Sequence, residues 1–189
     1  MIFDAGQVAT RTEGPGTLHD FANALVWLAF PRLKARLNAL HVDAQTGPNG
    51  SGRRGGVRDR ATLFDESGAF VLTQNPELAN LMRGFAWREL FVKRRAAWPD
   101  QIRVLIVGHA LLEKLRAPYK SICAQAWVLD CPTSIADNEL DRHAARMLNP
   151  ESLAALTPVP LMGIPGWSSA NHDPAFYNDS KVFRSGRRQ

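Results

Sequence analysis

Histidines and carboxylates recur at helical spacing in this sequence. His19 and Asn23 are four residues apart, and His109 and Glu113 have the same separation. Side chains four residues apart lie on one face of a helix. A neutral imidazole binds a divalent metal or accepts a proton, and a nearby carboxylate completes either kind of site. These two pairs are therefore the first candidates for chemistry.

His19 and Asn23 belong to a segment, 17–30, whose second half, ALVWLAF, is apolar almost all the way round. Such a pattern predicts a central, buried helix, and a polar pair on it must find partners. Two interpretations stay open for the pair: structural core residues, or one wall of a polar cleft. The next predicted helix, 32–43, has a core stripe of leucines flanked by Lys34, Asn38 and His41. If the two helices fold back on each other, His41 would approach His19.

His109 follows an apolar, β-branched run, 102–107, that predicts an interior strand. It opens a predicted helix, 109–116, so the helix dipole should disfavour its cationic form. Ligands in α/β proteins tend to bind at the ends of strands, which favours a functional role. A surface histidine at a helix start, beside a surface Glu113, is the structural alternative. The spacing lacks the second histidine of a zincin helix.

Further carboxylates come from Asp65 and Glu66, which lie between two apolar runs within residues 61–72. Together with Gly68 they predict the turn of a β-hairpin, preceded by Arg58. Acids in turns usually serve the turn itself, since Asp hydrogen-bonds its own backbone. Asp65 and Glu66 are nevertheless candidate partners for the histidines, because the flanking apolar runs tie this turn to the core.

The elements that must position these residues predict an α+β fold. The chain of 189 residues suits one domain, 1–189, mostly helical, with a β-hairpin and a small number of buried strands. Residues 47–56 predict a flexible, basic, Gly-rich loop outside the core. Residues 157–189 predict an irregular tail, rich in Pro and Gly, that wraps the domain.

A net charge of +5 and a pI of about 9.7 permit contact with nucleic acid or another anionic partner. Much of the excess lies in three stretches: near Arg58, at Lys93, Arg94 and Arg95, and at the C-terminus around Arg184. The chain has only two cysteines, which we expect to be buried free thiols, and its longest apolar run is far too short to cross a membrane. We therefore expect a cytoplasmic protein. Neither a P-loop nor a dinucleotide fingerprint nor a nucleophile elbow is present.

Several stretches together resemble the bacterial domain-of-unknown-function family 3025. They are TLHDFANALVWLAFPRLKARLNALH, RDRATLFDESG, GHALLEKL, MGIPGW and NHDPAFYNDSKVFR, in the order found in that family, and they cover about Gly6 to Arg184. Members are generally longer at the N-terminus, so the resemblance implies that Met1 is a late or truncated start. It also implies a bacterial, cytoplasmic protein, and it assigns no activity to the matching polar positions.

Two functional hypotheses follow from the residues. The first is a hydrolase-type enzyme that uses a cluster of histidines and carboxylates, with or without a divalent metal; its candidates are His19, Asn23, His41, Asp65, Glu66, His109 and Glu113, with Lys34, Asn38, Arg58 and Arg184 as binding residues. The alternative is a protein that binds nucleic acid or another anionic partner through the basic loop and tail. Converging imidazoles would favour the enzyme, and scattered ones the binding protein. The oligomeric state stays open.

Overall fold

The computed structural model describes residues 7–46 and 52–186. Its main helices and strands follow one another along the chain in this order: α2 (Thr17–Ala29), α3 (Pro31–Thr46), α4 (Gly52–Ser67), β1 (Gly68–Leu72), α5 (Pro76–Arg83), β2 (Arg103–Ile106), α6 (His109–Lys114), β3 (Cys123–Leu129), α7 (Asp137–Met147), α8 (Pro150–Ala154) and β4 (Thr157–Pro160). A short π-helix and several 3-10 turns complete the described chain. The predicted α+β class, mostly helical, is confirmed.

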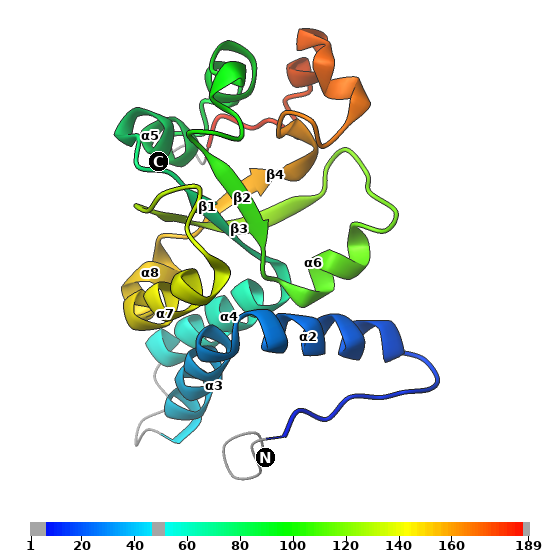
Figure 1. The fold of residues 1–189 in the computed structure, drawn as a ribbon, viewed down its shortest axis with the longest axis vertical. Coiled ribbons are helices and arrows are strands. Elements are labelled where there is room, and N and C mark those ends of the chain that lie inside the picture. The colour runs from blue at the N-terminus through cyan, green and yellow to red at the C-terminus, as the bar shows by residue number, and fades with distance from the viewer. Residues whose placement is uncertain (1–6, 47–51, 187–189) are drawn as a thin grey trace.

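The four strands form one mixed sheet in the order β2-β1-β3-β4 (Figure 1). β1 runs parallel to β3, with Phe70 beside Trp127, and antiparallel to β2, with Ala69 beside Ile106. β4 runs antiparallel to β3. The strand around Val104 was predicted to lie in the interior of the sheet. This prediction is wrong, because β2 is an edge strand. Only one of the four residues of β2 is buried, as expected for a strand at the edge of a sheet.

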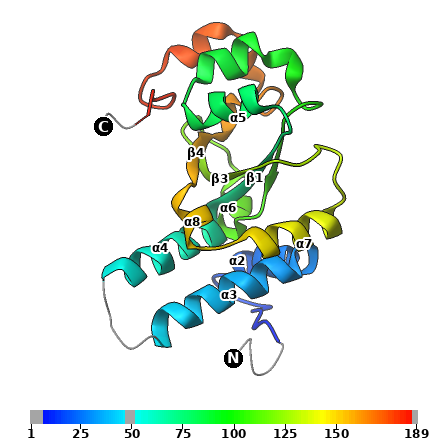
Figure 2. The ribbon, with the colours of Figure 1, turned by 90° about the vertical axis from the view of Figure 1, so that its left-hand side faces the viewer.

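The sheet carries a separate apolar core on each face, because successive strand residues point to opposite sides. Ala69 and Val71 face a core built with α5, the π-helix and the C-terminal segment. Phe70 and Leu72 face the other core, built with α2, α3, α4, α7 and α8. Figure 2 shows the N-terminal helices gathered at one end of the molecule and the C-terminal segment at the other. Within the described ranges, no helix combines the length and apolarity that a membrane span requires.

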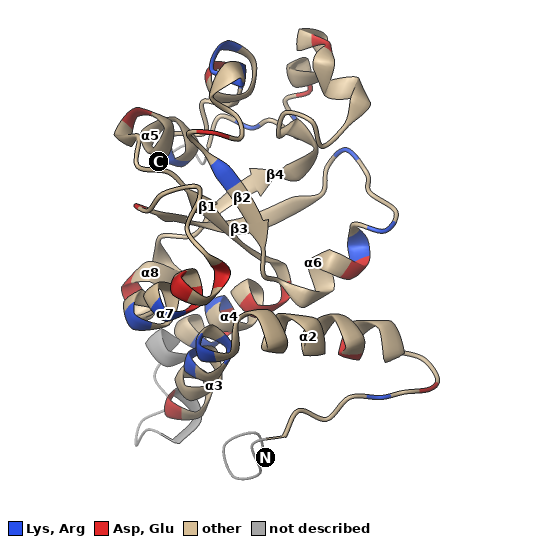
Figure 3. Cartoon of the chain, viewed as in Figure 1, with Lys and Arg blue, Asp and Glu red and all other residues tan. Residues whose placement is uncertain are grey.

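α2 packs along the outside of this assembly, against α6 and α3, and the prediction of a central, buried helix is wrong. Leu28 is 80% exposed, and Phe21 and Leu25 on the same side of the helix are also exposed. The ribbon of α2 is uncharged except at Asp20 (Figure 3). The prediction relied on the apolar residues all round the helix, but only the face with Ala22 and Val26 packs against a core.

The predicted hairpin over residues 61–72 is also wrong. Residues 61–67 are the last turns of α4, and only 68–72 form a strand. Val57, Ala61 and Phe64 recur at four- and three-residue spacing and pack as a helix into the core shared with α2 and α3. The helix extends back to Gly52, so the predicted loop is wrong for residues 52–56. Residues 47–51 lie outside the described part of the chain.

The predicted C-terminal tail begins with β4 and then continues mostly as short 3-10 turns. The amide of the fully buried Asn171 donates to the carbonyls of Met162 and Ile164, and Arg95 donates to its side-chain oxygen. The hydroxyl of Tyr177 donates to the Gly163 carbonyl. These polar side chains fasten the C-terminal segment to the core.

A buried carboxylate from α7 fixes the start of α3. Asp141 is 1% exposed, and its two oxygens accept hydrogen bonds from the backbone nitrogens of Arg32 and Leu33, at 3.2 and 2.9 Å. The first N–H groups of a helix have no partner within the helix, so a carboxylate there acts as a cap supplied from another element. This cap sets the angle at which α3 leaves α2.

We expect Asp141→Ala to lower the free energy of unfolding by about 1–3 kcal/mol, because it leaves buried N–H donors without partners. Urea denaturation followed by circular dichroism measures the change. Arg142→Ala, at an exposed neighbour on the same helix, is the matched control and should stay within about 0.5 kcal/mol of the parent. Equal stability of the two variants would show that the cap contributes nothing.

Candidate functional site

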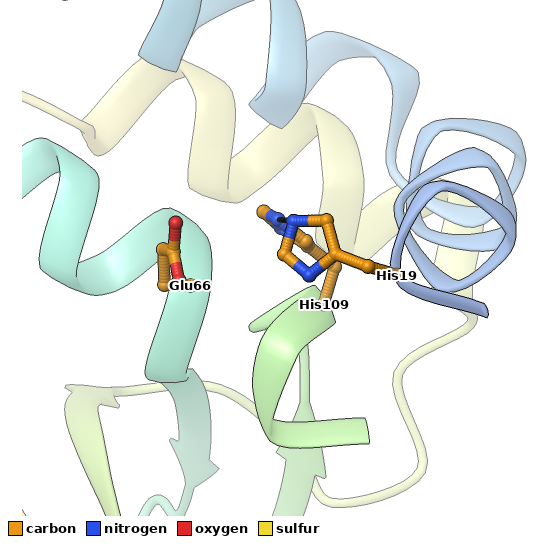
Figure 4. A group of neighbouring side chains, drawn as sticks. All are labelled: His19, Glu66 and His109. Atoms are coloured by element: carbon orange, nitrogen blue, oxygen red, sulfur yellow. Dashed lines mark hydrogen bonds between the residues drawn. The ribbon is translucent and has the colours of Figure 1, made fainter. Parts of the chain in front are cut away.

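Three helices meet where β1 begins and β2 ends. Because these strands are antiparallel, the end of α4 and the start of α6 are carried to the same end of the sheet. α4 delivers Asp65 and Glu66 there, and α6 delivers His109. α2 packs on α6 and brings His19 to the same place. Figure 4 shows His19 and His109 side by side, with Glu66 facing them from α4.

The two imidazoles are in direct contact. His19 Nε2 and His109 Nε2 are 3.1 Å apart, and the rings meet edge to face with centroids 4.5 Å apart. His109 is 5% exposed, and its Nδ1 lies 2.8 Å from the backbone oxygen of Asp65. Burial lowers the pKa of His109, although the charge of Asp65 partly opposes the change. The neutral form expected from the sequence thus has burial as its main cause.

The hydrogen-bond partners restrict where the protons of this pair can lie. A carbonyl oxygen only accepts, so His109 Nδ1 carries the proton, and Nε2 of the neutral ring presents a lone pair toward His19. Nδ1 of His19 lies 3.5 Å from the Glu113 carboxylate. If the Nδ1 proton of a neutral His19 faces Glu113, its Nε2 presents a second lone pair. Two lone pairs at this distance need a proton or a metal cation between them.

Glu66 supplies the third group of this cluster. One oxygen of its carboxylate and one ring nitrogen of each histidine all lie within 4.8 Å of one another. Glu66 occupies the last turn of α4, where the helix dipole disfavours a negative charge. Among the described residues it has no ion-pair or hydrogen-bond partner for its carboxylate. A cation beside the two imidazoles would compensate this charge.

The adjacent Asp65 is neutralised by a buried lysine. Lys34 on α3 is 4% exposed, and its Nζ lies 2.5 Å from Asp65 Oδ1. Charge pairing offsets the cost of burying the ammonium group. The charges of Lys34 and Asp65 cancel each other. The carboxylates of Glu66 and Glu113 then leave two negative charges around the two imidazoles. The electrostatic balance of the cluster therefore favours a divalent cation.

The remaining candidates from the first three helices lie around this cluster. Asn23 follows His19 by one turn, and its buried Oδ1 has no hydrogen-bond partner in the described chain. Burial lowers the pKa of His41, with Asp65 opposing the shift and Arg58 adding to it. His41 thus lies within electrostatic reach of Asp65, but in residues 7–46 and 52–186 it makes no ring contact with His19 or His109. Asn38 is half-buried on α3.

Arg184 lies elsewhere. It lines a hollow bordered by α8, β4 and the C-terminal segment, and that lining includes none of the histidines. The structure therefore groups His19, Glu66 and His109 with Asp65, Glu113 and Lys34, and it separates Arg184 from them. A role for any of these residues in catalysis stays a prediction.

Close packing of two glycines holds the cluster in place. A β-carbon at Gly108 would lie 2.6 Å from the Glu66 carbonyl oxygen and closer still to the Gly68 nitrogen. The amides of Val107 and Gly108 both donate to the Gly68 carbonyl, at 3.0 and 2.8 Å. This contact fixes His109 against the end of α4. Neither this contact nor the Lys34–Asp65 pair could be predicted from the sequence, since no local pattern reports a contact between distant segments.

Comparisons with known proteins identify the family and nothing beyond it. The chain belongs to the family described as protein of unknown function (DUF3025), whose model matches residues 1–187. This confirms the resemblance noted in the sequence. Neither the curated proteins nor the solved structures contain a significant match.

Gly108→Ala should destabilise the protein by about 1–3 kcal/mol, because backbone atoms cannot move aside as a flexible side chain can. Gly56→Ala is the control, since a β-carbon there meets nothing within 4 Å and alanine favours the helix by about 0.5–1 kcal/mol. Urea denaturation measures both. A Gly108→Ala protein as stable as the parent would contradict the close contact.

We also expect stability to decrease on acidification. Burial lowers the pKa values of His109 and His41 in the folded state, so the unfolded chain binds more protons near pH 6. The free energy of unfolding should therefore fall as the pH drops through about 6.5, the usual value for histidine. His109→Gln should make this dependence shallower, as measured by urea denaturation at a series of pH values. An unchanged slope in that variant would exclude a contribution from His109.

Proposed function

We propose, for this member of a family whose description assigns no activity, a hydrolase-type enzyme in which His19, His109 and Glu66 hold a divalent cation. The approach of the two Nε2 atoms to 3.1 Å carries the proposal. Zinc bonds of about 2.0–2.1 Å at tetrahedral angles place two ligand nitrogens about 3.3 Å apart. The observed separation is close to that value, and the Asp65 carbonyl at His109 Nδ1 leaves a lone pair available on His109 Nε2.

The set of donors fits a catalytic site better than a purely structural one. Two histidines and one carboxylate provide three protein ligands, and catalytic zinc sites typically keep a fourth position open. His19 and Glu66 are both partly exposed, so the cluster is accessible from the surface. A divalent cation bound there would lower the pKa of a bound water toward neutrality and polarise a substrate carbonyl or phosphoryl oxygen.

The surrounding residues would act by positioning the three ligands. The Asp65 carbonyl holds the proton of His109 on Nδ1, and the Glu113 carboxylate, 3.5 Å from His19 Nδ1, would favour a proton on that nitrogen of His19. Such outer contacts orient ligating histidines and raise their basicity. Lys34 keeps Asp65 in place through a buried ion pair. Asn23, with its unpartnered buried oxygen, would accept a hydrogen bond from a group bound beside His19.

We expect the protein to bind one equivalent of Zn²⁺ or Co²⁺, measured by equilibrium dialysis with elemental analysis and by the visible absorption of tetrahedral Co²⁺. His109→Ala and Glu66→Gln should each weaken binding at least 100-fold, since each removes a ligand. Glu113→Gln should weaken it about 10- to 100-fold, as expected for an outer-shell partner. His172→Ala, at an exposed histidine outside the cluster, is the matched control and should bind as the parent does.

Turnover then tests the hydrolase itself. The Zn²⁺-loaded protein should cleave p-nitrophenyl acetate or bis(p-nitrophenyl) phosphate, with activity lost in His109→Ala and retained in His172→Ala. Turnover without metal that still requires His109 and Glu66 would indicate general acid–base catalysis by these residues instead of metal-assisted catalysis. Absence of both specific metal binding and turnover would make the cluster structural and overturn the proposal.

A further inference from the structure

The hollow that Arg184 lines has a volume of about 880 Å³, and none of the histidines belongs to its lining. Its walls come from α4, β3, α8, β4 and the C-terminal segment; in Figure 2, β4 and α8 lie between α4 and that segment. We call it the basic hollow and define it by Arg60, Leu63, Phe85, Cys123, Lys181 and Arg184. It brings Arg60 into the same lining as Lys181 and Arg184, which are far from it in the sequence.

The charge of the basic hollow is uncompensated. Three cationic side chains line it, those of Arg60, Lys181 and Arg184, and its lining contains no acidic residue. Within residues 7–46 and 52–186, none of the three forms an ion pair. Arg184 Nε donates to the carbonyl of Lys181, so the terminal nitrogens of its guanidinium remain available as donors.

Apolar side chains form the rest of the wall. Leu63, one turn after Arg60 on α4, is 43% exposed, and Phe85 and Leu156 are half-buried. The backbone at Arg184 is anchored, since its carbonyl accepts a 2.7 Å hydrogen bond from the Trp87 indole and the neighbouring Phe183 is buried. Its exposed side chain is held by the hydrogen bond from Nε to the Lys181 carbonyl. The hollow therefore combines a held cationic group with apolar surface that is in contact with solvent.

The edge of the sheet limits what can bind there. Pro158 and Pro160 of β4 line the hollow, and proline in an edge strand turns its nitrogen away from the ladder. The outward side of β4 thus lacks N–H donors at these positions, so an extended peptide cannot add as a further strand. A compact molecule fits better, because small-molecule sites typically measure about 300–1,000 Å³ and are mostly apolar with a few polar groups.

We propose that the basic hollow binds a small amphipathic anion. Its carboxylate or phosphate group pairs with Arg60, Lys181 and Arg184, and its apolar body covers Leu63, Phe85 and Leu156. Bidentate guanidinium contacts recognise either head group. This proposal is independent of the metal site, because the two linings share no residue.

Fluorescence of 1-anilinonaphthalene-8-sulfonate, an amphipathic anion, tests the proposal by direct titration, with decanoate, decyl phosphate and uncharged decanol as competitors. We expect saturable binding at one site, displaced by decanoate or decyl phosphate and at least tenfold less well by decanol. The more effective of the two anions identifies the head group. Arg184→Ala and Arg60→Ala should each weaken binding about tenfold, which corresponds to the loss of one charge-assisted contact.

Two variants and one further ligand decide between the alternatives. Arg142→Ala removes an exposed cation outside the hollow and should leave binding unchanged, as should Glu66→Gln, which disables the proposed metal site. Equal affinities in the parent, Arg60→Ala and Arg184→Ala proteins would overturn the proposal. So would tighter binding of a single-stranded oligonucleotide that depends on the same arginines and falls steeply with salt, which would assign the surface to nucleic acid.

Discussion

The absence of a side chain at Gly108 allows the end of β2 to lie directly against the start of β1. The backbones approach closely enough for the amides of Val107 and Gly108 to share the Gly68 carbonyl. His109 therefore emerges next to the last turn of α4, within reach of the Asp65 backbone oxygen. This junction determines where the candidate metal ligands lie. The buried Lys34–Asp65 pair and the packing of α2 on α6 depend on it too.

The parts of the fold that are encoded locally could be predicted from the sequence. The helices predicted over 17–30 and 109–116 and the strand predicted over 102–107 each follow from a short pattern, and the structure has a helix or strand at each place. Residues 61–72 show the limit of such reasoning. Gly68 resembles the glycine of a turn, but in the structure it follows the end of α4, where a β-carbon would meet Phe64, and its carbonyl accepts from Val107 and Gly108. No local pattern distinguishes the two uses.

The same limit applies to burial and to the candidate site. The apolar content of α2 indicated a buried helix, but composition does not reveal how many neighbours a helix will have. The sequence could name His19, Glu66 and His109 as chemically capable residues, because residue type is local information. It could not tell that His41 stays apart from the other two imidazoles, or that Lys34 neutralises Asp65, because tertiary packing decides both.

The contact between His19 and His109 spans 90 residues, and its sequence order has a consequence for synthesis. α2, α3 and α4 leave the ribosome before most of the sheet on which they pack. Until the sheet has emerged, a nascent chain exposes Val26, Phe30 and Leu33, which the folded protein buries in one core with Phe70 and Trp127. Transiently exposed apolar surface of this kind is prone to aggregate and is what chaperones recognise. The N-terminal helices should therefore be the part of this protein that most needs protection during translation.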